Sequence, residues 1–223
     1  MNYLLALIMI FSVLKLKAQS AEDLIQKIRA KLERVNNYEA EAKLKTNVSF
    51  IKAPIANVKI YYTKPDKVKI INKNGISFIP RGTVNINLGS VIMNNKTFDI
   101  IDVGKDNTGL RIIKLLPKED TADVVLSTLY IDEKHLLIKK SKTTTKESGT
   151  YELEMTYGSY SDYGLPEKII FTFNTKEYRL PKGVTLDYDN GSKKNEDRLK
   201  NKKGTIEITY IRYIINKGAR SVN

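Results

Sequence analysis

The chain has 223 residues, of which 41% are hydrophobic and 28% charged, enough for one well-buried globular core. It contains no cysteine, so disulfide bonds are excluded and packing alone must hold the fold. The net charge of +13 favours anionic partners such as lipid headgroups or acidic proteins. Nucleic acid is disfavoured, because the lysines are scattered along predicted strands instead of forming an arginine–aromatic stripe. Solvated strand faces would also account for these lysines, and this alternative stays open.

Residues 1–20 are predicted to be a signal peptide. The apolar run from Leu4 to Leu14 has the length of a signal-peptide core and is too short to span a bilayer. Ala18 and Ser20 supply small residues for a cleavage site. We therefore expect an exported chain in which residues 21–223 form a single domain. The alternative is a buried N-terminal helix.

The segment from Ser20 to Asn36 predicts the one clear helix. Ser20 and Asp23 resemble a capping box, with Asp in place of the usual Glu. Apolar residues recur at helical spacing on one face, at Leu24, Ile25, Ile28, Leu32 and Val35.

After this helix the hydrophobic period changes to two, which predicts strands with one buried and one solvated face. The inward set of the first long strand is Tyr38, Ala40, Ala42, Leu44, Val48 and Phe50. Val58, Ile60 and Tyr62 continue the pattern, and a turn at Pro65-Asp66 leads to Val68 and Ile70. Asn74-Gly75 predicts a further hairpin.

More strands are expected to the end of the chain, separated by turn-forming residues. They are residues 98–103, 110–116, 122–131, 136–145, 150–157, 167–174, 183–188 and 205–215. About ten strands at this spacing predict an antiparallel sheet, sandwich or barrel. Residues 81–95 could form a strand or a short lid helix. Residues 190–203 are almost entirely polar and are predicted to form a loop.

The sequence offers little catalytic chemistry. His135 is the single histidine, and it lacks the second histidine or cysteine that a transition-metal site needs. No nucleophile elbow and no phosphate-binding glycine loop is present. We therefore expect a protein that is not an enzyme and uses no metal or cofactor.

Four segments carry a resemblance to a known family. Residues 21–45 read as a helix that runs into a strand, and residues 57–71 as a strand–basic–proline–strand run. Residues 178–186 contain a Pro-Lys-Gly-Val run, and residues 131–134 lie at a central hairpin. Together these segments resemble the LolA-like family of periplasmic carriers of outer-membrane lipoproteins, in its first helix and strand, its signature, a late segment and its central hairpin.

This resemblance implies a mainly β fold: an open, incomplete antiparallel barrel of about ten or eleven strands, with an N-terminal helix and short lid helices around an apolar cavity. It implies a monomeric periplasmic carrier that takes lipoprotein acyl chains, or another amphiphile, from an inner-membrane donor towards an outer-membrane acceptor. The alternative function is a lipid-sensing or scaffolding module that binds a partner protein. At the family's gating arginine, before the signature proline, this chain has Lys64, which cannot form arginine's planar fork of donors.

Strand parity predicts a ligand-binding wall, with an ordinary filled core as the alternative. Its residues are Leu44, Val48, Val58, Ile60, Tyr62, Val68, Ile70, Met155, Tyr157, Ile169, Phe171 and Phe173. Lys64 is predicted to act at the rim, by contacting lid carbonyls or a lipid headgroup, or else to be an exposed turn lysine.

The loop at 190–203 is predicted to dock transiently on an anionic membrane surface, or else simply to keep the protein in solution. Its basic residues are Lys193, Lys194, Arg198, Lys200, Lys202 and Lys203.

Overall fold

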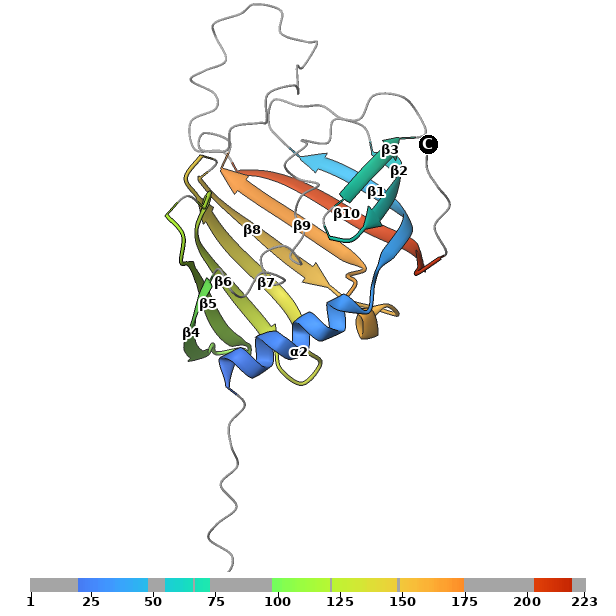
Figure 1. The fold of residues 1–223 in the computed structure, drawn as a ribbon. Helices are drawn as coiled ribbons and strands as arrows, with labels where there is room; N and C mark the ends of the chain where they lie inside the picture. The colour runs from blue at the N-terminus through green and yellow to red at the C-terminus, as the bar shows by residue number, and fades with distance from the viewer. Residues whose placement is uncertain are drawn as a thin grey trace, which may run out of the picture.

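The computed structural model describes residues 20–47, 55–65, 67–72, 98–120, 122–147, 149–174 and 203–217. Within these ranges the chain forms one α-helix, one 3₁₀ turn and ten strands (Figure 1). The elements are α2 (Ala21–Glu33), β1 (Asn37–Asn47), β2 (Ala56–Thr63), β3 (Lys67–Asn72), β4 (Phe98–Lys105), β5 (Arg111–Pro117), β6 (Val124–Asp132), β7 (Leu137–Thr145), β8 (Gly149–Thr156), η3 (Ser161–Tyr163), β9 (Lys168–Asn174) and β10 (Lys203–Ile215).

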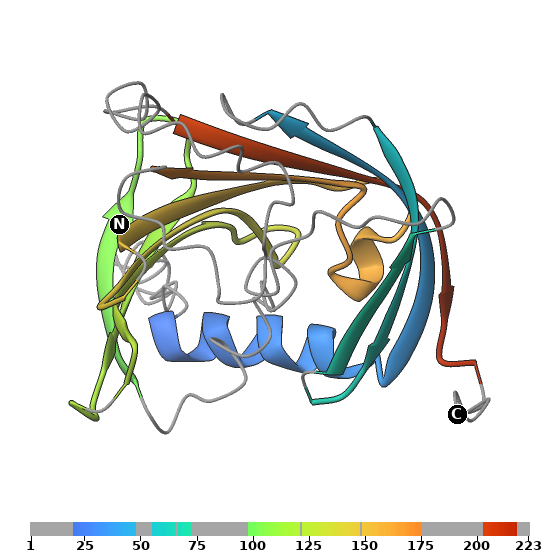
Figure 2. The same cartoon turned by 90° about the horizontal axis from the view of Figure 1, so that it is seen from above.

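All ten strands belong to one antiparallel sheet in the order β3-β2-β1-β10-β9-β8-β7-β6-β5-β4. The outermost strands, β3 and β4, are not paired with each other, so the sheet is an open barrel. Seen from above, the sheet curves until its two arms stand on opposite sides of a common interior (Figure 2). The prediction of a mainly β, open antiparallel barrel with an N-terminal helix is confirmed.

The two halves of the chain are joined where β1 lies between β2 and β10. Tyr38 at the start of β1 is opposite Ile215 near the end of β10. A bulge after Glu41 leaves Ile211 without a partner in the ladder, and its side chain is exposed. Pairing between segments this far apart in sequence makes the barrel a property of the whole chain.

Helix α2 lies within the predicted range and covers the concave side of the sheet. The Ser20 hydroxyl accepts a hydrogen bond of 3.1 Å from the Asp23 amide, as the capping prediction required. Leu24, Ile25 and Ile28 are at most 2% exposed and join the sheet's buried cluster. The helix contacts β4 and η3 and runs across the opening between the two arms (Figure 2).

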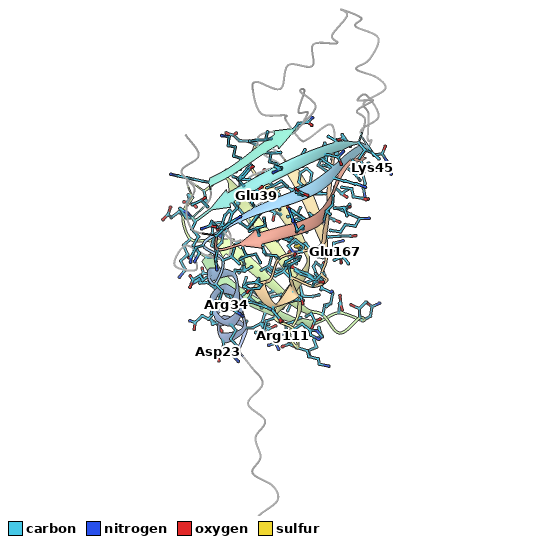
Figure 3. The ribbon with its side chains drawn as sticks, turned by 90° about the vertical axis from the view of Figure 1, so that its right-hand side faces the viewer. Asp23, Arg34, Glu39, Lys45, Arg111 and Glu167 are labelled. Atoms are coloured by element: carbon cyan, nitrogen blue, oxygen red, sulfur yellow. The ribbon has the colours of Figure 1, made fainter. Side chains whose placement is uncertain are left out.

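The two faces of the sheet differ in chemistry as the alternation predicts. Inward residues form one buried apolar cluster with α2. The outer face carries cross-strand ion pairs such as Lys59–Glu39 at 3.0 Å and Lys168–Glu207 at 3.1 Å. Figure 3 shows Asp23, Arg34 and Arg111 at the end of the molecule where α2 lies, and Lys45 at the far end of β1.

Most predicted strand boundaries agree with the structure to within two residues. One residue of the predicted loop belongs to a strand, and several predicted segments lie outside the described residues. Lys203 begins β10 and pairs with Asn174, so it belongs to a strand instead of the predicted loop. The Asn74-Gly75 hairpin, the strand at 183–188, the lid at 81–95 and residues 190–202 lie outside the described residues.

Candidate functional site

The predicted ligand-binding wall lies on the inner face of the sheet. Seven of its residues are between 1% and 8% exposed, namely Leu44, Val58, Ile60, Tyr62, Met155, Phe171 and Phe173. Four more are partly buried and pack against the same cluster, namely Val68, Ile70, Tyr157 and Ile169. Val48 lies outside the described residues. The structure therefore brings eleven predicted residues onto one apolar face, without deciding whether they bind a ligand.

Strand register joins these residues into continuous rows across the sheet. One row runs from Met155 through Ile169 and Ile208 to Leu44. Two inner-face rows further along, beyond the row of Leu153, Phe171 and Ile206, Phe173 is opposite Gly204. A Cβ atom at Gly204 would come within 2.6 Å of the Phe173 ring. The missing side chain at Gly204 thus makes room for this aromatic ring.

A patch of hydroxyl groups interrupts the apolar face on β6, β7 and β8. Ser127 is opposite Thr143, which in turn is opposite Tyr151. The Ser127 Oγ and Thr143 Oγ1 atoms are 2.9 Å apart, and Tyr151 lies beside Thr143 on the next strand. Ser141 faces the interior between Leu129 and Leu153 and is 1% exposed. Its hydroxyl oxygen has no hydrogen-bond partner among the described residues.

A cluster of tyrosines closes the other half of the inner face, near the C-terminal end of α2. The Tyr213 ring stacks on Tyr210 at a centroid distance of 4.8 Å and meets Tyr38 and Tyr160 edge-on at 5.2 Å and 4.9 Å. Its hydroxyl donates to the Pro166 carbonyl at 2.8 Å. Burial raises the pKa of Tyr213 well above its usual value and that of Tyr210 to about 12, so both hydroxyls stay protonated at neutral pH.

Lys64 lies where the turn after β2 meets helix α2. Its ammonium group donates to the Glu33 carbonyl at 2.5 Å, and its backbone amide donates to the Asn36 carbonyl at 2.9 Å. A cation at a helix C-terminus satisfies a free carbonyl and complements the helix dipole. Lys64 therefore contacts a carbonyl of α2, while its predicted role at the rim stays a prediction.

Two further basic side chains tie α2 to distant loops. Lys31 donates to the His135 carbonyl in the β6–β7 turn at 2.6 Å. Arg34 donates to the Asp162 carbonyl in η3 at 3.1 Å and lies over the Tyr163 ring. Together with Lys64, these contacts hold the helix across the opening of the barrel.

A charged cluster lies at the turn end of β4, β5 and β6. Arg111 pairs with Asp102 and, at 2.8 Å, with Glu133, which also binds Lys105 at 2.6 Å. The hydrogen bond from Arg111 holds the pKa of Asp102 below its usual value. The hydrogen bond from Lys105, with help from Arg111, does the same for Glu133.

No metal centre is visible in the described ranges, where no three His, Cys, Asp or Glu side chains gather closely enough to hold an ion. His135 is exposed, and its Nδ1 atom lies 2.7 Å from Asp132 in the same turn. As for membrane insertion, α2 and the other described segments provide no helix long and apolar enough to cross a bilayer.

The sequence-based list of site residues missed the hydroxyl patch and the rest of the tyrosine cluster. Ser127 could have been found by parity, because it precedes Leu129 and Ile131 at spacings of two on one strand. Ser141 alternates in the same way with Thr143 on the next strand. Their side-by-side position depends on strand register, which no local pattern reveals.

Comparisons with known proteins reveal the fold class. No family model matches the chain, and no curated protein matches its sequence. A solved domain assigned to outer membrane lipoprotein sorting, from Vibrio parahaemolyticus, superposes with a TM-score of 0.53 at 10% identity, over 91% of this chain and 96% of that one.

Two other solved structures agree with this result. A LolA superfamily protein from Nitrosomonas europaea gives a TM-score of 0.51 at 8% identity, covering 90% of this chain and 95% of that one. A DUF1329 family protein from Desulfovibrio piger gives 0.55 at 11% identity, covering 89% and 93%. The chain therefore has a LolA-like fold, as its sequence motifs implied, and at these identities the likeness extends to the fold alone.

Proposed function

We propose that this chain is a non-enzymatic periplasmic carrier that binds lipoprotein acyl chains, or another amphiphile, and delivers them towards the outer membrane. The single observation that carries the proposal is the inner face of the sheet, where eleven apolar or aromatic wall residues gather on the concave side of an unclosed barrel. A curved apolar face beneath a tethered helix is a suitable surface for hydrocarbon.

The energetics of acyl transport support this proposal. Each CH₂ group withdrawn from water contributes about 0.8 kcal/mol, so a sixteen-carbon chain has roughly 12 kcal/mol at stake in crossing an aqueous compartment. An unclosed barrel exposes part of its cargo and can release it to an acceptor. In this proposal residues 1–20 export the chain, and the mature domain, residues 21–223, acts as a monomer.

Two surface features complete the proposed transport cycle. Lys64 links the β2–β3 turn to α2 through a hydrogen bond to the Glu33 carbonyl. Movement of α2 away from the barrel would break this hydrogen bond. The basic residues of 190–203 would dock weakly on anionic lipid, because each contributes at most about 1 kcal/mol and salt screens the attraction.

Binding of a fluorescent fatty acid tests the carrier proposal. Ile169→Glu and Phe171→Glu place a carboxylate on the inner face and should abolish binding. Ile170→Glu places the same group on the opposite face of the same strand and should leave binding unchanged. Circular dichroism checks that each variant is folded. Undiminished binding by folded inner-face variants would contradict the proposal, whereas lipid extracted from the purified protein and seen by mass spectrometry would support it.

A scaffold that binds a partner protein is the second candidate. The tyrosine cluster favours it, because side chains of β1, β2 and β10 meet there and fill part of the interior. A scaffold would bind no fatty acid in the same assay. Its inner-face variants would only lose stability.

A further inference from the structure

The hydroxyl patch is unusual because it lies inside an apolar wall. Leu115, Ser127, Thr143, Tyr151 and Phe173 follow one another in one cross-strand row, so the hydroxyls have apolar residues at both ends. Ser127, Ser141 and Thr143 are at most 3% exposed. A pure hydrocarbon ligand gains nothing from these groups, and an ordinary filled core would be more stable without them.

The patch holds O–H groups that the hydrogen bond within it does not use. Ser127 and Thr143 share one hydrogen bond, so one of their two O–H groups is not used between them, and Tyr151 is next to Thr143 in the same cross-strand row. Ser141, two residues from Thr143 on the same strand and face, adds an O–H group that bonds to no residue in the described ranges. Burial raises the pKa of Tyr151, which keeps its hydroxyl neutral and able to donate.

A neutral ligand group that accepts hydrogen bonds suits the unused O–H groups of this patch. A carboxylate or phosphate would lose its hydration inside an apolar wall without meeting a cation, because the neighbours in these rows are Leu115, Leu129, Leu153 and Phe173. The carbonyl oxygen of an ester is neutral and accepts two hydrogen bonds. In an acylglycerol, ester carbonyls lie at the point where the acyl chains begin.

We propose that Ser127, Ser141, Thr143 and Tyr151 form a subsite that donates hydrogen bonds to the ester carbonyls of an acylglycerol bound against the inner wall. The proposal rests on the carrier function, and it assigns the depth and orientation of the cargo. The acyl chains extend from the patch along the apolar rows, with the ester linkages at β6–β8.

Ester and ether lipids with identical chains separate this proposal from the carrier function. A diacylglycerol and its dialkyl ether analogue present the same hydrocarbon, but only the ester has carbonyl oxygens. Competition against a fluorescent fatty acid should show about tenfold tighter binding of the ester, as one or two added hydrogen bonds allow. Equal binding of the two lipids would overturn the subsite and leave the carrier intact. Binding of neither would overturn both.

Variants then test the assignment to these residues. Ser141→Ala combined with Thr143→Val should reduce the ester preference to less than about twofold while ether binding stays unchanged, which also shows that the variant is folded. Thr144→Val is the matched control, because Thr144 forms a similar hydroxyl pair of 2.9 Å with Thr150 on the outer face. A double variant that kept the full ester preference would overturn the assignment, as would a control that lost it.

Discussion

The tyrosine cluster and the hydroxyl patch are two polar regions of the same inner face. They differ in whether their buried hydroxyl groups all form hydrogen bonds. In the tyrosine cluster, Tyr213 and Tyr160 donate to backbone carbonyls of Pro166 and of Tyr213 itself. In the hydroxyl patch, Ser141 has no hydrogen-bond partner within the part of the chain that the structure describes. A satisfied buried hydroxyl contributes about 1 kcal/mol of stability, whereas an unsatisfied one costs about 1–3 kcal/mol. One region therefore stabilises the barrel, and the other, in our proposal, keeps hydrogen-bond donors for a ligand at a cost in stability.

The largest expected effect comes from emptying the tyrosine cluster. Tyr213→Ala removes a ring that is 6% exposed and contacts three other tyrosines, so we expect the free energy of unfolding to fall by about 3–5 kcal/mol. Urea unfolding followed by circular dichroism measures this. Tyr61→Ala, on the outer face of β2, should cost about 1 kcal/mol or less. Similar losses for the two variants would contradict the structural role of the cluster.

Removing a single hydroxyl from each region gives the sharpest test of the comparison. Tyr213→Phe leaves the Pro166 carbonyl without its donor and should lower the free energy of unfolding by about 1 kcal/mol. Ser141→Ala removes an unpartnered hydroxyl and should raise it by up to about 1 kcal/mol. Denaturant titrations of the ligand-free protein give both values. If the two changes had the same sign, the contrast between the regions would be wrong.

Part of the pH dependence of stability should come from the Arg111 cluster, in addition to Asp132 and Glu152, whose pKa values are also lowered, and none from either hydroxyl region. Asp102 and Glu133 have pKa values lowered in the folded state, so their stabilisation is complete above their unfolded values of about 4 and is lost as the pH falls through the lower folded values. Because these carboxylates are partly exposed, we expect a loss below about 1 kcal/mol. Arg111→Met should make the free energy of unfolding fall less steeply as the pH is lowered from 5 to 2.

Two controls accompany the pH measurement. Lys118→Met removes only an exposed pair with Asp99 and should leave the acid limb unchanged. The effects of Tyr213→Phe and Ser141→Ala should be the same at pH 3 and pH 7, since neither hydroxyl titrates in that range. If the free energy of unfolding of the Arg111 variant fell with pH as steeply as that of the wild type, the cluster would not contribute to the acid dependence.

The smallest effect on stability is expected at Lys64, at the edge of the tyrosine cluster. Lys64→Leu removes the hydrogen bond to the Glu33 carbonyl and should lower the free energy of unfolding by about 0.5 kcal/mol. If α2 must move to admit lipid, transfer of a fluorescent lipid to vesicles should change in rate by more than this small destabilisation explains. Lys67→Leu, an exposed lysine on β3, is the control. Equal transfer rates in both variants would leave Lys64 as a simple turn lysine.

The sequence by itself was sufficient for the local structure of this protein. The spacing of Leu24, Ile25 and Ile28 identified the helix and its buried face, and Ser20 marked its start. Alternation identified the buried faces of β1, β2, β8 and β9, because a side-chain period of two is written directly into the order of residues. Motif resemblance then added the open barrel, which the alternation alone had not separated from a sandwich.

Only the tertiary structure decided which strands are neighbours and where distant side chains meet. The pairing of β1 with β10 joins Tyr38 to Tyr213, and the β6–β7 and β7–β8 registers align Ser127, Thr143 and Tyr151. The contact of Lys64 with Glu33 depends on how α2 crosses the barrel. These contacts follow from burying all the inward faces in one common interior, a condition on the whole chain that no local stretch of sequence expresses.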